Sequence, residues 1–185
     1  MKDFNRSNPL FSLCGLNCGL CPMRLDGYCP GCGGGKGNQP CATARCSLRH
    51  GGIEYCFQCP AYPCETYDSL DEYDSFITHH NRQRDLAKAQ ETGIDNYQLE
   101  LEEKIEILNY LLANYNDGRR KTFFCVAVNL LELDDIKTIM SQLAEKTEPL
   151  PLKERAAYAV RLFQSAAEPR GIVLKLRRKA GKSKG

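Results

Sequence analysis

Ten of the chain's eleven cysteines lie between residues 14 and 64, and their spacing is the clearest sign of chemistry in the sequence. Three C-x2-C pairs occur there, and such a pair presents two thiolates from one tight turn to a single tetrahedral metal ion. We therefore interpret this segment as a metal-binding module and expect zinc. The predicted ligands are Cys14, Cys18, Cys21, Cys29, Cys32, Cys41, Cys46, Cys56, Cys59 and Cys64.

The number of cysteines predicts two zinc ions or more, because two closed four-cysteine sites use eight of the ten thiolates. We expect the C-x2-C pairs to anchor the sites, and the other four cysteines to complete the ligand shells. Spacing alone leaves open which cysteines share a metal. His50 is the nearest additional candidate ligand, and an ordinary exposed loop histidine is the alternative.

An iron–sulfur cluster is the alternative cofactor. The opening triplet, Cys14-x3-Cys18-x2-Cys21, has the spacing by which radical enzymes of the S-adenosylmethionine class hold a four-iron cluster. Those enzymes complete their site with an α/β barrel, and nothing here alternates strand and helix over the required length. Cys56-x2-Cys59-x4-Cys64 has a spacing that also suits iron. The alternative function is therefore an iron–sulfur-carrying redox or accessory protein.

A second group of charged residues, Arg119, Arg120 and Lys121, directly precedes an apolar helical stretch. Three cations at a helix start oppose the helix dipole, so an anion or an acidic partner would stabilise them. Pairing with the acidic segment 65–117 is the alternative. Cys125, inside the apolar stretch, is interpreted as a small buried hydrophobe, and no catalytic residue is predicted.

The elements that must position these residues are mainly α-helical. Residues 1–65 read as an irregular zinc-knuckle module with short β-turn elements, rich in Gly and Pro, that packs on a helical bundle over 66–148. A C-terminal helix and a basic tail fill 149–185. Helical periodicity predicts helices near 70–77, 78–92, 95–115, 119–131, 134–148 and 152–167, followed by a short extended piece at 172–176.

The helix over 95–115 has the clearest pattern. Apolar residues recur with alternating spacings of four and three, from Leu101 to Tyr115, as on one face of an amphipathic helix. Asp95 with Gln98 three residues later resembles a capping box, and Gly93 suits a left-handed stop for the preceding helix. The helix over 119–131 is apolar around most of its circumference, which predicts a central place in the bundle.

Charge and hydropathy limit the class of protein. Lys and Arg against Asp and Glu number 6 to 3 in residues 1–64, 4 to 13 in 65–117 and 15 to 7 in 118–185. The sequence has no secretory signal and no membrane-spanning stretch. We therefore expect a cytoplasmic protein whose cysteines stay reduced, with an exported disulfide scaffold as the alternative.

Several motifs together resemble a known family. They are Cys14-Gly-Leu-Asn-Cys18-Gly-Leu-Cys21-Pro, Cys29-Pro-Gly-Cys32, Cys56-Phe-Gln-Cys59-Pro-Ala-Tyr-Pro-Cys64-Glu, Glu91-Thr-Gly-Ile-Asp95 and Asp117-Gly-Arg-Arg-Lys121-Thr-Phe-Phe-Cys125-Val-Ala-Val-Asn-Leu-Leu131. Over residues 12 to 144 the chain is similar to the prokaryotic cysteine-rich family called domain of unknown function 3795. The resemblance implies a metal-binding domain with a helical remainder and no established activity.

These observations lead to one functional expectation. The metal is predicted to be structural, and the chain to be a binding or adaptor module rather than an enzyme. Its partner would be a protein or a nucleic acid, contacted through the cysteine module and the basic residues near Arg119 and in the tail.

Overall fold

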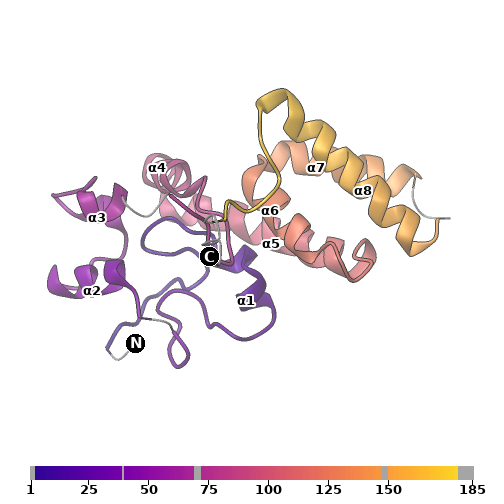
Figure 1. Ribbon diagram of the computed structural model, residues 1–185. Coiled ribbons are helices and arrows are strands. Elements are labelled where there is room, and N and C mark those ends of the chain that lie inside the picture. Colours follow the sequence, from indigo (N-terminus) through magenta and orange to yellow (C-terminus); the bar gives the residue numbers. More distant parts are fainter. Residues whose placement is uncertain (1–2, 39, 69–71, 147–149, 179–185) are drawn as a thin grey trace, which may run out of the picture.

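The computed structural model describes residues 3–38, 40–68, 72–146 and 150–178 (Figure 1). These residues are mainly helical and contain no β-strand, which confirms the expected mainly α fold. The zinc-knuckle character of residues 1–65 stays a prediction.

The cysteine-rich segment consists of short helical turns joined by loops. In chain order these are the 3-10 helix η1 (Cys18–Leu20), α1 (Pro22–Leu25), α2 (Ala42–Arg49), the 3-10 helix η2 (Cys56–Gln58) and α3 (Glu65–Asp68). Helices α2 and α3 lie next to each other at one end of the molecule (Figure 1).

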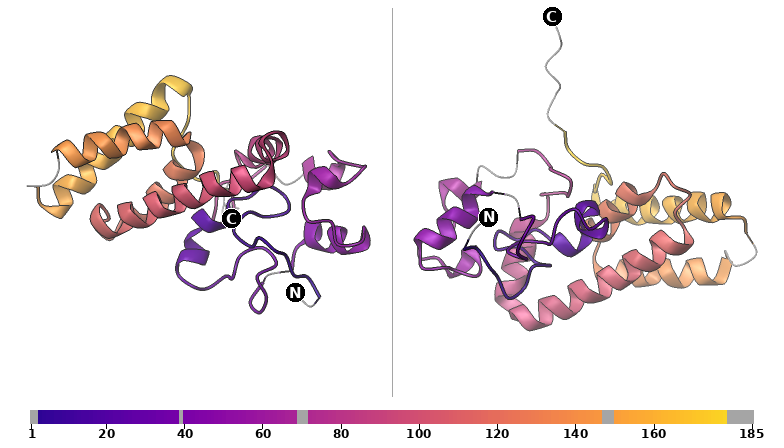
Figure 2. Two further views of the ribbon diagram at one scale, coloured as in Figure 1. Left: turned by 180° about the vertical axis from the view of Figure 1, so that it is seen from behind. Right: turned by 90° about the horizontal axis from the view of Figure 1, so that it is seen from below.

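The remaining chain forms five longer helices. They are α4 (Arg82–Thr92), α5 (Ile94–Asn114), α6 (Lys121–Leu130), α7 (Leu133–Lys146) and α8 (Leu152–Ala167), with η4 (Glu168–Arg170) after them. Helices α7 and α8 pack side by side, and α6 lies against α5 (Figure 2). No helix in the described ranges combines the length and apolar character that crossing a membrane requires.

The apolar stripe of α5 is confirmed, but its predicted cap is wrong. Leu101 and Leu108 are buried, as the spacing predicts. The helix begins at Ile94, and its N-cap is Gly93, which has a positive φ of 91° and makes no side-chain cap. The Gln98 side chain instead accepts a hydrogen bond from Asn8 Nδ2 at 3.1 Å, so it is not available for a capping box.

Helix α6 occupies the centre of the bundle, as its uniform apolarity predicts. Every residue from Phe124 to Leu130 is buried, and Leu131 beyond its end is buried too. The Phe124 ring meets the ring of Phe163 on α8 edge to face, with centroids 5.9 Å apart. Helix α8 has the predicted bounds, and Ala156, Ala159 and Phe163 face the core.

The helix predicted near 70–77 is wrong where the structure describes it. Leu70 lies outside the described residues, and residues 72–80 form turns and loop. The Asp74 carboxylate accepts the backbone N–H of His79 at 2.8 Å and that of Arg177 at 2.7 Å. Such side-chain bonding to the backbone competes with helix formation. The C-terminal segment is thereby held extended beside this loop.

The main apolar core crosses the boundary expected between cysteine module and bundle. Phe11, Leu20, Tyr55 and Tyr67 from the cysteine segment belong to the same buried cluster as the inward residues of α4 to α8. Phe11 and Tyr97 of α5 have ring centroids 4.5 Å apart. The cysteine segment has few apolar residues of its own, and it therefore shares a core with the helices.

Replacing Phe163 by alanine tests the attachment of α8. The ring is fully buried, so Phe163→Ala should lower the free energy of unfolding by about 3–5 kcal/mol. The matched control is Leu99→Ala, because Leu99 is 64% exposed, and it should change that free energy by about 0.5 kcal/mol or less. Urea unfolding measures both. Equal effects of the two substitutions would contradict this packing.

Candidate metal centre

Two of the three C-x2-C pairs adopt the same backbone turn. Cys18 and Cys56 each open a 3-10 turn, and their carbonyl oxygens accept the backbone N–H of Cys21 and Cys59 at 3.1 and 3.0 Å. The second cysteine has φ −83° and ψ 130° in one turn, and φ −80° and ψ 131° in the other. Each is followed by proline. This repeated local geometry suits paired thiolate ligands.

The third pair, Cys29 and Cys32, has a different turn that requires glycine. Gly31 has φ +91°, and a Cβ there would lie 2.3 Å from the Pro9 carbonyl oxygen. Proline followed by a glycine of positive φ is typical of a type II turn. The Cys32 N–H donates to the same Pro9 carbonyl at 2.9 Å. Residue 9 therefore fixes the position of this turn.

The chain between residues 10 and 13 joins the first two turns. The Leu10 carbonyl accepts the N–H of Gly19 at 2.9 Å, and the Leu13 carbonyl accepts the N–H of Cys56 at 2.8 Å. The apolar run Leu10-Phe-Ser-Leu13 is thus a buried connector that holds two cysteine turns at a set separation.

A first group of thiols gathers around Cys14. Burial raises the pKa of Cys14 to about 11, and negative charge on Cys32 and Cys41 would raise it further. Burial likewise raises the pKa of Cys18, with Cys32 and Cys14 adding to the effect. These four thiols are electrostatic neighbours, although 27 residue positions separate the first from the last.

A second group gathers around Cys56. Burial raises the pKa of this thiol to about 12, and Cys14, Cys64 and Cys46 add to the shift. A cavity of about 40 Å³ lies beside it. Its lining contains four of the predicted ligands together with His50; the cysteines are Cys46, Cys56, Cys59 and Cys64.

Of the remaining cysteines, Cys125 lies within α6 and has Cys21 as an electrostatic neighbour. Burial raises the pKa of Cys21, and negative charge on Cys29 would raise it further. Cys125 is 3% exposed, and burial raises its pKa to about 12. A thiol in that state is protonated at neutral pH, which agrees with its interpretation as a buried hydrophobe.

Two buried arginines lie beside the two sets of cysteines around Cys14 and Cys56. The Arg82 guanidinium lies 3.9 Å from the centre of the Tyr67 ring and donates to the Tyr67 carbonyl, and its charge partly offsets the burial that raises the pKa of Cys14 and Cys56. The Arg6 side chain donates to the Phe11 carbonyl at 2.7 Å, and its charge partly offsets the burial that raises the pKa of Cys32. Buried cations favour thiolates over thiols.

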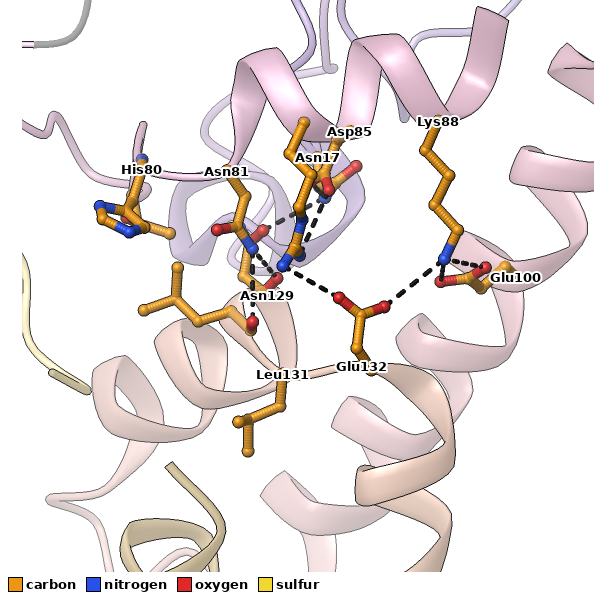
Figure 3. Close-up of polar contacts among 12 residues, drawn as sticks. Asn17, His80, Asn81, Asp85, Lys88, Glu100, Asn129, Leu131 and Glu132 are labelled. Carbon is orange, nitrogen blue, oxygen red and sulfur yellow. Dashed lines mark hydrogen bonds and ion pairs between the residues drawn. The ribbon is translucent and has the colours of Figure 1, made fainter. Parts of the chain in front are cut away.

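These two arginines and the polar residues around Asn17 were not found from the sequence. Arg82 stands in a stretch of polar residues that reads as a solvated helix face, and no spacing rule marks it. Asn17 Nδ2 donates to Asp85 Oδ2 at 2.7 Å and to Asn129 Oδ1 at 3.1 Å, and its Oδ1 accepts the Tyr97 hydroxyl at 2.9 Å. Figure 3 shows Asn17 between α4 and α6.

The same polar cluster continues toward the surface (Figure 3). Glu132 pairs with Arg84 at 2.9 Å and with Lys88 at 3.5 Å, and Lys88 also contacts Glu100 at 2.7 Å. Lys104 is buried and donates to the Leu131 carbonyl at 2.9 Å. The arrangement holds α4, α5 and the α6–α7 connection together.

The predicted anion or partner contacts lie together at the start of α6. Arg119 is exposed, Arg120 lies 3.7 Å from Asp117, and Lys121 forms an ion pair with Asp26 of the cysteine segment. The Asn116 side chain accepts the backbone N–H of Arg120 at 3.0 Å, so part of the helix start already has an acceptor. Within the described part of the chain, Arg119 alone of the three forms no ion pair.

The thiols do not form a preformed metal shell. Among the residues that the structure describes, no three or more His, Cys, Asp or Glu side chains are placed so that they could hold a metal ion. All eleven cysteines are free. The assignment of the ten predicted ligands to metals therefore stays a prediction. No family model, curated protein or solved structure matches this chain.

Buried Asp85 generates a prediction on pH. Burial raises its pKa from 3.8 to about 6, so between these two pH values the folded protein holds a proton that the unfolded chain has lost. This contribution to stability is complete below about pH 4 and is lost as the pH rises through about 6. It amounts to at most about 3 kcal/mol, since one pKa unit corresponds to about 1.4 kcal/mol.

Asp85→Asn should remove that dependence, because an amide does not titrate. We expect the variant's unfolding free energy to fall less between about pH 5 and pH 7.5 than that of the parent protein. Urea unfolding at each pH measures this, with metal content recorded at every point. The control is Asp95→Asn, which changes an exposed carboxylate and should keep the parental pH dependence. Parallel curves for the parent and Asp85→Asn would contradict the assignment.

Proposed function

We propose that this chain is a zinc-binding protein whose metal sites are structural and support a binding or adaptor module. The observation that carries the proposal is the repeated cysteine turn. Two segments 38 residues apart, at Cys18 and Cys56, adopt the same C-x2-C-Pro conformation inside one folded unit. A shared conformation in unlike sequence contexts indicates a shared requirement, and binding zinc through paired thiolates is such a requirement.

The donor set suits zinc in two further respects. Thiolates are soft ligands that favour zinc, and buried Arg6 and Arg82 lie where they would offset the negative charge of thiolate-rich sites. Bound zinc would supply cross-links between loops that the backbone hydrogen bonds alone hold weakly. The chain's own residues supply the positions of the sulfurs, through the turns at Cys18, Cys32 and Cys56.

Dense cysteines that bind metal rather than form disulfides are typical of a reducing compartment, which supports the cytoplasm as the proposed location. The resemblance to domain of unknown function 3795 supports the same proposal of a metal-binding domain with a helical remainder.

Metal analysis tests the proposal directly. Protein purified without added metal and without oxygen should be colourless and carry roughly two zinc ions per chain or more, because each closed site takes four thiolates. A chelator should then lower the thermal midpoint, since structural zinc contributes free energy of folding.

The alternative is an iron–sulfur centre in residues 14–64. The observation in its favour is the clustering of Cys14 and Cys18 from the opening triplet, which are electrostatic neighbours. A brown protein with stoichiometric iron and labile sulfide would overturn the zinc proposal and support this one.

The partner is proposed from exposed charge. Helix α2 of the cysteine segment carries Arg45 and Arg49, both exposed, and neither forms an ion pair within the described part of the chain. Arg119 at the start of α6 is exposed in the same way. Cationic side chains without partners are typical of contacts to phosphates or acidic protein surfaces.

Salt dependence distinguishes the two kinds of partner. If the partner is nucleic acid, binding to a short duplex should weaken steeply as salt rises. Arg119→Gln should reduce the slope of log affinity against log salt by about 1. The control is Arg170→Gln, because Arg170 already pairs with Asp135. Absent or salt-independent binding in fluorescence anisotropy would exclude nucleic acid and leave a protein partner.

A further inference from the structure

We propose that Cys46, Cys56, Cys59 and Cys64 form one closed four-thiolate site for a single zinc ion, and that His50 lies outside its ligand set as a hydrogen-bond donor to Cys46. This inference rests on the proposed zinc-binding function and goes beyond it by naming which cysteines share a metal. The spacing of the sequence left both the partition and the role of His50 open.

The four cysteines come from three elements that converge on one cavity. Cys46 lies in the second half of α2, Cys56 and Cys59 flank the η2 turn, and Cys64 directly precedes α3. The cavity between them has a volume of about 40 Å³. Figure 1 shows α2 and α3 side by side, which is the arrangement that brings the two ends of this segment together.

The backbone fixes each of these cysteines in place. The Cys59 N–H bonds to the Cys56 carbonyl at 3.0 Å, and the Cys64 carbonyl accepts the N–H of Tyr67 at 2.8 Å at the start of α3. The Cys46 carbonyl accepts the N–H of His50 at 3.1 Å at the end of α2. Each sulfur still turns about one side-chain bond, so forming the ligand shell requires new side-chain rotamers.

The rest of the cavity wall suits a single ion in a dry site. Apart from the cysteines and His50, it is formed by aliphatic side chains, two tyrosine rings and hydroxyl residues, with no carboxylate; these are Leu13, Thr43, Ser47, Ile53, Tyr62, Thr66 and Tyr67. Thiolates are therefore the only anionic ligands that this lining offers. A small cavity also favours one ion over a cluster of several iron and sulfide atoms.

His50 adds a hydrogen bond beside a ligand shell that four thiolates already complete. Its Nδ1 lies 2.9 Å from the Cys46 carbonyl oxygen, which can only accept, so Nδ1 carries the hydrogen. The same atom lies 3.6 Å from the Cys46 sulfur. A donor beside a ligating sulfur stabilises the thiolate and orients it, as outer-shell groups do around metal sites. The exposed position of the ring agrees with a place at the edge of the site.

Arg82 supplies the charge that such a site needs. Four thiolates with one divalent zinc ion carry a net charge of about −2, and a buried charge requires a partner. The Arg82 guanidinium is 1% exposed and packs on the Tyr67 ring, which itself lines the cavity. This arginine belongs to α4, so the proposed site would be coupled electrostatically to the helical bundle.

The test compares zinc content in full-length variants. Cys46→Ser, Cys59→Ser and the double variant should each lose about one zinc ion per chain relative to the parent, and the double no more than either single, because one site is lost in all three. Cys32→Ser, from the other thiol group, combined with Cys59→Ser should lose about two. Cys125→Ser is the control and should keep the parental zinc content. His50→Gln should still reach the parental number of zinc ions when zinc is in excess, because His50 is not a ligand, although its affinity for zinc should fall.

A second measurement uses the unmodified chain and does not depend on variants that fold. During stepwise removal of zinc by a chelator, alkylation followed by mass spectrometry should show Cys46, Cys56, Cys59 and Cys64 becoming reactive together. If these four cysteines become reactive in separate steps, the partition is overturned. It is also overturned if His50→Gln, with all its cysteines intact, binds fewer zinc ions per chain than the parent protein when zinc is in excess. A parent protein without zinc overturns the proposed function itself, so the two failures are distinguishable.

Discussion

The side chain of Asn17 is the contact on which the relation between the cysteine segment and the helices depends. It precedes Cys18 directly, and its amide meets Asp85 of α4, Tyr97 of α5 and Asn129 of α6 at once. A buried amide that loses its partners costs about 1–3 kcal/mol, so the cysteine turn can dock in only one orientation without that penalty. Apolar packing around Phe11 and Leu20 supplies attraction, which is less selective for geometry.

This interface also contains buried charge, which is costly by itself. Asp85, Lys104 and Arg82 are each at most 5% exposed, and replacing such groups by apolar residues often stabilises a protein. Their retention here agrees with a role in fixing how the cysteine loops meet the bundle. The loops have little regular secondary structure of their own, so orientation has to come from specific polar contacts.

The sequence predicted the elements whose information is local. Helices α5, α6 and α8 follow from periodic apolar residues, and the buried residues Leu108, Phe124 and Phe163 are those the period selects. It failed where a distant residue decides the local conformation. Asp74 bonds to Arg177, 103 positions away, and Gln98 bonds to Asn8, 90 positions away. The grouping of cysteines is equally non-local, because Cys18 has Cys32 and Cys14 as electrostatic neighbours in addition to Cys21, its C-x2-C partner.

The contact between Asp74 and Arg177 has a topological consequence. The Asp74 carboxylate is 1% exposed and receives the backbone N–H and the guanidinium of Arg177, while its own N–H donates back to the Arg177 carbonyl at 2.9 Å. The chain from Asp74 to Arg177, which includes α4 to α8, therefore forms a long loop whose two ends are joined by this contact. The entropic cost of closing a loop of this length is only about 0.6 kcal/mol more than that of closing a loop of half the length. This contact thus attaches the segment around Arg177 to the rest of the fold, and cutting the chain before Arg177 would remove the attachment.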